Sequence, residues 1–161
     1  MRPHSPAFLL ALAASLSLPA TGAPSDGPPP REVHMVYMGG NDCPPCVAWR
    51  KDELPKLQQT AAFKGIRFSH VNKSIRSAVP PSFFLPEEVR HYKAQLDAAG
   101  GGNIGSPQTA ILVNGKVYDY YFGSRSAADI EAMLQAIQDR TPYPWPRCVR
   151  RGARWACEDG G

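Results

Sequence analysis

The first half of the chain carries the hydrophobic pattern of a strand, a helix and a second strand. Residues 33–38 form an apolar run with β-branched side chains, as expected of a strand buried on both faces. Residues 66–71 alternate between apolar and polar side chains, which also indicates a strand. Between them we expect a helix that starts at Pro44 and that Pro55 kinks or ends near Leu54. The two strands of such a β-α-β unit should be parallel.

The second half of the chain predicts a helix and then a hairpin. Pro86 opens a helical pattern, and glycines 100–102 end it. Strands are expected at 108–113 and 116–122, because the Asn114-Gly115 pair between them is a strong signal for a tight hairpin.

A last helix is expected after this hairpin. Ser126 and Asp129 fit an N-cap pair. The apolar positions that follow repeat at helical spacing: Ile130, Met133, Leu134 and Ile137. The complete order is then β-α-β-α-β-β-α, which predicts an α/β fold.

The start of the chain has the composition of a secretory signal peptide at residues 1–23. Arg2 supplies the positive start, an apolar run follows, and small residues near Ala20 and Ala23 suit cleavage. The apolar run is shorter than the about 20 residues that a membrane-spanning helix needs. We therefore expect a periplasmic or secreted protein with no stable membrane span after cleavage.

Composition divides the rest of the chain into three parts. Residues 24–31 are rich in Pro, Ser and Gly and should form a flexible lead-in. The predicted strands and helices occupy 32–139, which suits one domain with one core. Residues 140–161 form a tail rich in Pro and Arg. The formal net charge of +4 is mild, so the composition gives no reason to expect nucleic-acid binding.

The four cysteines form two pairs with different surroundings. Disulfides persist in exported proteins, and Cys148 and Cys157 in the tail fit a structural disulfide that closes a short loop. Cys43 and Cys46 lie where the first strand meets the first helix, which is the layout of a dithiol redox centre. A bridge across two residues closes so short a loop that it adds little stability. This favours a redox role over a structural one.

The motif Asp42-Cys43-Pro44-Pro45-Cys46 sets the expected chemistry of this pair. The helix N-terminus supplies unpaired N–H groups and a positive dipole end, which stabilise a thiolate at Cys43 and lower its pKa. Pro44 and Pro45 have no N–H, so the amide of Cys46 is the first that faces the Cys43 sulfur. The like charge of Asp42 should oppose the shift. We expect a reachable Cys43 to attack and a more buried Cys46 to resolve.

These features resemble the thioredoxin superfamily, over roughly residues 32–139. A second part of the resemblance is Gly-Ser-Pro-Gln-Thr at 105–109, directly before an apolar strand and a hairpin. The resemblance implies a thioredoxin-like fold in its minimal β-α-β-α-β-β-α form, with a mixed four-stranded sheet and helices on both faces. It also implies a cis peptide bond before Pro107, which would pack against the Cys-x-x-Cys, and a backbone at Ser106 that pairs with a bound polypeptide.

The resemblance also implies an activity and its partners. Thiol–disulfide exchange at Cys43 and Cys46, bordered by Pro44 and Pro45, would act on client proteins that carry cysteines or disulfides. An unidentified envelope redox partner would reset the couple. No cofactor is expected because the two sulfurs carry the electrons, and we expect a monomer.

Two departures from thioredoxins concern the neighbours of the motif. Asp42 stands where thioredoxins have a tryptophan, and Tyr37 stands where they bury a carboxylate, so no base for Cys46 is assigned. Arg50, one helical turn past Cys46, is either a source of positive potential for the sulfurs or a solvated charge. Phe83 and Phe84 either border the site as a lip or seal the sheet face.

Three other functions stay open from the sequence. The first is a non-catalytic thioredoxin-like binding module of an envelope assembly, and the second is a reductase that serves one pathway only. The third is a metal site, either zinc on the four cysteines or copper on Met35, Met38 or His70. The pattern around the two methionines favours core positions instead.

Overall fold

The structure, a computed structural model, describes residues 29–151 and 154–158, with side chains to residue 147. The elements in chain order are β1 (Val33–Met38), α1 (Pro44–Asp52), α2 (Leu54–Leu57), α3 (Ala61–Lys64), β2 (Arg67–Val71), the 3₁₀ turn η1 (Ser82–Phe84), α4 (Glu87–Arg90), α5 (Lys93–Gly100), β3 (Gln108–Val113), β4 (Lys116–Phe122), α6 (Ala127–Asp139), β5 (Arg147–Arg151) and β6 (Arg154–Glu158). The predicted signal peptide lies outside the described residues.

A four-stranded mixed sheet in the order β2-β1-β3-β4 forms the centre of the fold. β1 and β2 are parallel, as the β-α-β pattern predicts, whereas β1–β3 and β3–β4 are antiparallel. The hairpin at Asn114-Gly115 joins β3 to β4, and Asn114 has the positive φ of 51° that such a turn requires. The predicted α/β, thioredoxin-like arrangement is confirmed.

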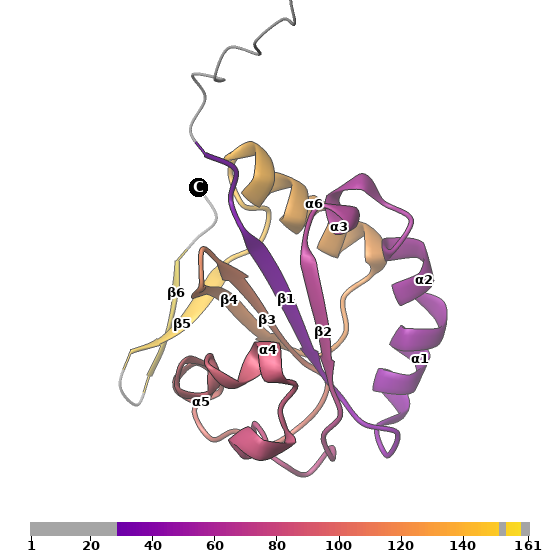
Figure 1. Ribbon diagram of the computed structural model, residues 1–161, viewed down its shortest axis with the longest axis vertical. Coiled ribbons are helices and arrows are strands. Elements are labelled where there is room, and N and C mark those ends of the chain that lie inside the picture. Colours follow the sequence, from indigo (N-terminus) through magenta and orange to yellow (C-terminus); the bar gives the residue numbers. More distant parts are fainter. Residues whose placement is uncertain (1–28, 152–153, 159–161) are drawn as a thin grey trace, which may run out of the picture.

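Helices cover both faces of this sheet (Figure 1). One face packs against α1, α2, α3 and α6 in a core that includes Trp49, Leu57 and Phe63. The other face packs against α4 and α5 through Val89 and Leu96. Side chains of β1 alternate between these two cores, so the whole strand is buried, as its apolar run predicts.

Proline and capping residues set the helix boundaries. α1 ends at Asp52, and a new short helix begins at Leu54 with Pro55 in its first turn, as predicted. Ser126 and Asp129 form a complete capping box at the start of α6. The single helix predicted after Pro86 is instead two helices, because the chain turns after α4 and carries the buried Tyr92 onto the sheet face.

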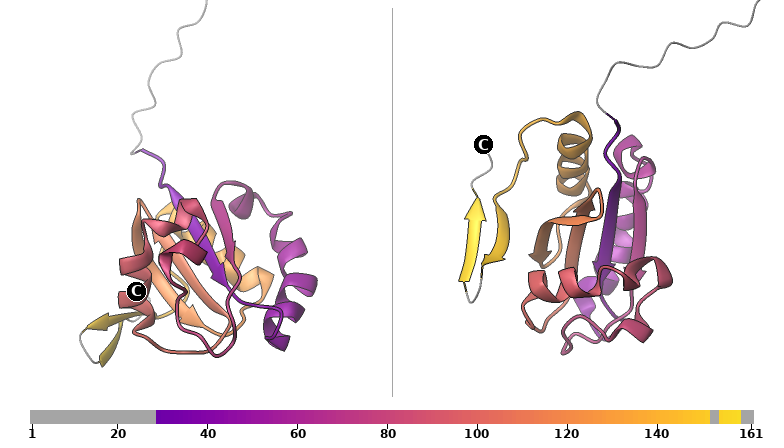
Figure 2. Two further views of the ribbon diagram at one scale, coloured as in Figure 1. Left: turned by 60° about the horizontal axis from the view of Figure 1, so that its bottom comes forward. Right: turned by 60° about the vertical axis from the view of Figure 1, so that its left-hand side comes forward.

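The tail forms a hairpin rather than an irregular segment. β5 and β6 pair antiparallel with Cys148 opposite Cys157, and the hairpin lies beside the β4 edge of the main sheet (Figure 2). The side chains of Cys148 and Cys157 lie outside the described part, so their disulfide stays a prediction. Within residues 29–151 and 154–158, every helix is too short or too polar to cross a membrane.

Candidate active site

A disulfide joins Cys43 and Cys46 at the start of α1, with an S–S distance of 2.04 Å. Cys43 is the N-cap residue, and its sulfur accepts a hydrogen bond from the Cys46 amide at 3.3 Å. Pro44 and Pro45 fill the first two helical positions, where a missing N–H leaves no partner unsatisfied. The contact between the Cys46 amide and the Cys43 sulfur is therefore the one that the proline spacing predicts.

Both cysteines are buried in this disulfide-bonded state. Cys43 and Cys46 are each 0% exposed, whereas Pro44 and Pro45 beside them are exposed. The expectation of a reachable Cys43 and a more buried Cys46 is therefore wrong for this state. The core packing that encloses α1 covers the two sulfurs equally, so an attacking sulfur reaches Cys43 only after neighbouring side chains move.

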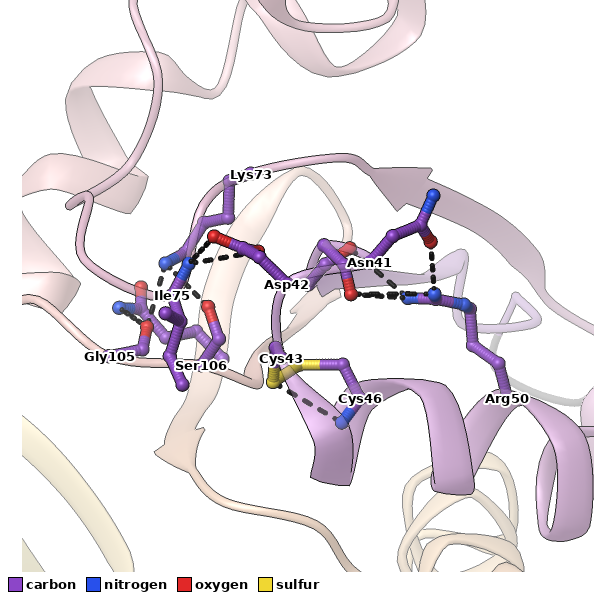
Figure 3. The surroundings of a disulfide bond; sticks show 12 residues. Asn41, Asp42, Cys43, Cys46, Arg50, Lys73, Ile75, Gly105 and Ser106 are labelled. Carbon is purple, nitrogen blue, oxygen red and sulfur yellow. Dashed lines mark hydrogen bonds between the residues drawn. A yellow bond between two sulfur atoms is a disulfide. The ribbon is translucent and has the colours of Figure 1, made fainter.

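The loop before β3 meets the disulfide at one end of the sheet. Met38, the last residue of β1, lies opposite Gln108, the first residue of β3. The chain that leads to Cys43 and the loop that ends at Pro107 therefore share this edge. The Ser106–Pro107 peptide bond is cis, Pro107 is buried and Ser106 is half-buried. Figure 3 shows Ser106 near the disulfide.

Lys73 holds this loop from the segment after β2. Its side chain is 4% exposed, and Nζ donates to the carbonyl oxygens of Ser77 and Gly105 at 2.7 Å and to Ser106 Oγ at 2.8 Å. A longer contact of 3.3 Å reaches the Ser74 carbonyl. Burial lowers the pKa of Lys73 to about 8, against the field of Asp42, which raises it.

Lys73 is not among the site residues predicted from the sequence, because it lies in a polar segment without periodicity. One sequence signal points to it. Lys73 follows the end of β2 by two residues, and the carboxyl ends of parallel strands meet at one edge of a sheet. That edge is where the Cys43 motif begins.

Asp42 binds the same segment, on the side of Cys43 that faces Lys73 (Figure 3). Its carboxylate accepts hydrogen bonds from Ser74 Oγ at 2.7 Å and from the Ile75 amide at 3.2 Å. The bond from Ser74 is the main cause that lowers the pKa of Asp42. The carboxylate thus fixes the loop after β2 next to the motif.

Arg50 lies on the other side of the motif (Figure 3). Its guanidinium donates to Asn41 Oδ1 at 2.7 Å and to the carbonyl oxygens of Gly39 and Gly40 at 3.3 Å. Arg50 is therefore not simply a solvated charge. It ties helix α1 to the turn that precedes Cys43.

Tyr37 occupies the position where thioredoxins bury an acid. Its ring stacks on Trp49 with centroids 4.3 Å apart, and its hydroxyl donates to the Cys46 carbonyl at 3.4 Å. Burial raises the pKa of Tyr37 to about 12. At neutral pH this hydroxyl is uncharged, so it can orient the first turn of α1 but does not act as a base for Cys46.

Two hollows flank the motif. A cavity of about 420 Å³ lies beside Pro45 and is lined by Trp49 and Arg125 among others. A cavity of about 430 Å³ on the other side is lined by residues of the loop after β2 and by Phe84. Phe84 is 67% exposed and Phe83 is 71% exposed, so these rings do not seal the sheet face. Of the two alternatives for them, the lip is the one that fits.

The structure does not bring the suggested copper ligands together. Met35 packs in the core on the α1 side of the sheet, and Met38 packs in the core on the opposite side. His70 Nε2 lies 2.8 Å from the Gly39 carbonyl. The methionines are thus core residues, as their pattern favours.

Comparison with known proteins gives distant structural matches only. No protein-family model and no curated protein sequence matches the chain. A thioredoxin-family thiol:disulfide interchange protein from Chlorobium tepidum TLS is 20% identical, with a TM-score of 0.43 over 66% of this chain and 80% of that one. The N-terminal domain of PilB from Neisseria gonorrhoeae is 15% identical, with a TM-score of 0.40 over 65% and 76%. DsbH oxidoreductase is 19% identical, with a TM-score of 0.41 over 66% and 73%.

Proposed function

We propose that this protein is an exported thiol–disulfide oxidoreductase that exchanges electrons with client cysteines through Cys43 and Cys46. The observation that carries the proposal is the disulfide at the first turn of α1, where the Cys43 sulfur caps the helix and accepts the Cys46 amide. After reduction, this helix end stabilises a thiolate at Cys43 because it carries partial positive charge. The signal-like residues 1–23 support export.

In the reducing direction, the Cys43 thiolate attacks one sulfur of a client disulfide. A bond forms between Cys43 and the client, and the other client sulfur leaves as a thiolate and takes up a proton. Cys46 gives its proton to water and attacks the Cys43 sulfur, which restores the Cys43–Cys46 bond and releases the second client sulfur as a thiolate that also takes up a proton. The client gains two electrons and two protons. The reverse sequence oxidises a client dithiol, and an envelope dithiol–disulfide partner resets the couple in either case.

The surroundings of the disulfide supply contacts for a client chain. In this proposal the backbone at Ser106 pairs with an extended client segment, as strands add to the edge of a sheet. The two cavities beside the motif offer space for client side chains on either side of the attacked sulfur. No cofactor enters the reaction, because both electrons reside on sulfur.

Access to the buried disulfide requires a movement in its surroundings. Ile75 packs against the core that contains both cysteines, and the hydrogen bonds from Ser74 Oγ and the Ile75 amide to Asp42 hold its backbone there. A client that displaces the Ile75 side chain from this core opens a path to Cys43. The proposal therefore includes an opening step before sulfur exchange.

A trapping experiment tests the proposal. In Cys46→Ala the attacking sulfur is kept and the resolving thiol is lost, so mixed disulfides with clients should accumulate on Cys43 in the cell envelope. They should disappear when the sample is reduced. The matched control is the double variant Cys43→Ala, Cys46→Ala, which keeps Cys148 and Cys157 and therefore reports adducts formed by the tail. If Cys46→Ala forms no adducts beyond this control and the wild type reduces no disulfide, the proposal is wrong.

The burial of both sulfurs favours a second candidate, a thioredoxin-like binding module with a structural disulfide. In that case the folded protein should keep its Cys43–Cys46 bond in millimolar dithiothreitol and lose it only in denaturant. For the oxidoreductase, the bond should be reduced in the folded state within minutes. Alkylation of free thiols followed by mass measurement separates the two candidates.

A further inference from the structure

We propose that Lys73 is a positioning residue that holds the Gly105–Pro107 loop in the form that binds the client backbone. The inference rests on the proposed function and assigns a role to a side chain outside the motif. Lys73 does not contact the sulfurs in any described interaction. Its contacts go to the loop on which a client chain would pair.

The ammonium group of Lys73 joins two segments that are far apart in sequence. One short contact goes to the Ser77 carbonyl in its own segment, and two go to the Gly105 carbonyl and Ser106 Oγ. These three contacts of 2.7–2.8 Å use all three hydrogens of an ammonium group. A neutral or shorter side chain at position 73 leaves three oxygens without this donor.

A second set of contacts fixes the segment that carries Lys73. Asp42 accepts from Ser74 Oγ and from the Ile75 amide, directly next to Lys73 in sequence. The Gly105–Pro107 loop is thereby linked, through Lys73 and its segment, to Asp42, the residue that precedes Cys43. The two surfaces that a client must touch at once, the attacked sulfur and the pairing backbone, are held in register through Lys73.

Gly105 carries the backbone carbonyl through which Lys73 holds this loop. Its φ of +114° is accessible to glycine and strained for other residues, so its carbonyl direction is not fixed by local sterics. Its carbonyl also accepts from Gln108 Nε2 at 2.8 Å. Lys73 and Gln108 together therefore set the direction of the peptide that leads into Ser106.

The inference predicts a difference between polypeptide and small disulfides. A client chain uses both the sulfur and the backbone at Ser106, whereas bis(2-hydroxyethyl) disulfide has no peptide backbone and uses the sulfur only. Loss of Lys73 should weaken the reaction with the first and spare the reaction with the second. A change in the sulfurs themselves would affect both alike.

The test is Lys73→Met, with insulin as polypeptide substrate and bis(2-hydroxyethyl) disulfide as small substrate. We expect the KM for insulin to rise about tenfold with little change in kcat, while the rate with the small disulfide stays within twofold of wild type. The equilibrium constant for exchange with glutathione should also stay within twofold. Lys64→Met is the matched control, since Lys64 is an exposed lysine on α3, and it should change none of these.

Each other outcome has a defined meaning. If Lys73→Met leaves the KM for insulin unchanged, or lowers both reactions alike, the positioning role is wrong while the proposed function stands. A wild type that reduces the small disulfide but not insulin also overturns the inference. A wild type that reduces neither substrate overturns the proposed function. Should Lys73→Met fail to fold, Ser106→Ala removes one of the three acceptors alone, and a rise of about threefold in the KM for insulin is then the required result.

Discussion

Lys73 and Asp119 are both charged, both buried and differently placed. Lys73 is 4% exposed at the sheet end that carries the disulfide, and Asp119 is 1% exposed in β4. Burial shifts both pKa values toward the neutral form, down for Lys73 and up for Asp119. Their partners differ. Three short contacts join Lys73 to two segments at the proposed site, whereas the Asp119 carboxylate accepts a hydrogen bond from Tyr143 Oη at 2.9 Å.

The comparison shows which property of a buried charge indicates its role in this protein. The pKa shift and the burial are similar in kind at both positions, so neither quantity separates them. The chain segments that the charge joins do separate them. Lys73 connects the loop after β2 to the loop before β3, and Asp119 connects β4 to the start of the tail at Tyr143. The first connection bears on the proposed site and the second on the attachment of the tail.

The largest effect is expected from reversing the charge at Lys73. Lys73→Glu places a carboxylate against three oxygens that now accept from an ammonium group. A buried charge without a partner costs about 3–5 kcal/mol, so the free energy of unfolding should fall by about that amount in urea titrations. Asp119→Asn removes a buried charge and keeps the acceptor for Tyr143. Its free energy of unfolding should fall by less than about 1.5 kcal/mol. An equal loss in free energy of unfolding in the two variants would mean that the Lys73 contacts do not stabilise the fold more than the Asp119 contact does.

A smaller effect is expected from removing the donor to Asp119. Tyr143→Phe leaves the buried carboxylate without this hydrogen bond, and an unsatisfied buried acceptor costs about 1–3 kcal/mol. The loss should appear as a lower midpoint of thermal unfolding. Because Asp119 is placed with the tail rather than the site, the rate of insulin reduction by the folded variant should remain within twofold. A large drop in that rate at a temperature where the variant is folded would contradict the contrast between the two charges.

Much of the fold follows from the sequence, because its strands carry simple signals. β1, β3 and β4 have the predicted bounds, since an apolar run and the Asn114-Gly115 pair define them locally. The tail hairpin was not predicted, because its strands at 147–158 are rich in arginine and show no apolar alternation. Local pattern determines an element only where the element is built from local signals.

The site divides in the same way. The Cys43–Cys46 geometry follows from the spacing of prolines and cysteines along one helix turn. The burial of both sulfurs and the contacts of Lys73 to Gly105 and Ser106 arise from packing between segments that are 30 or more residues apart. No pattern within one segment encodes such a contact. The sequence therefore predicts the reactive pair but neither the burial of its sulfurs nor the contacts of Lys73.

The last expected effect is a pair of opposite pH dependences. Lys73 has a folded pKa of about 8, below its ordinary value near 10.5. Between these values the unfolded chain holds a proton that the folded protein has lost, so stability rises with pH in this window. Asp119 has a folded pKa above its ordinary value of 3.8, so just above pH 3.8 the folded protein holds the extra proton and stability falls as pH rises.

Differences between the wild type and single variants isolate these two contributions. From pH 8 to pH 10, the free energy of unfolding of wild type should increase relative to Lys73→Met. From pH 3.5 to pH 6, it should decrease relative to Asp119→Asn. Urea titrations of the disulfide-bonded proteins at each pH give both slopes. If the free energy of unfolding of wild type relative to Lys73→Met does not change from pH 8 to pH 10, folding does not lower the pKa of Lys73. The contacts to the Ser77, Gly105 and Ser106 oxygens then offset the cost of burial, and the ammonium group holds the client-binding loop across this pH range.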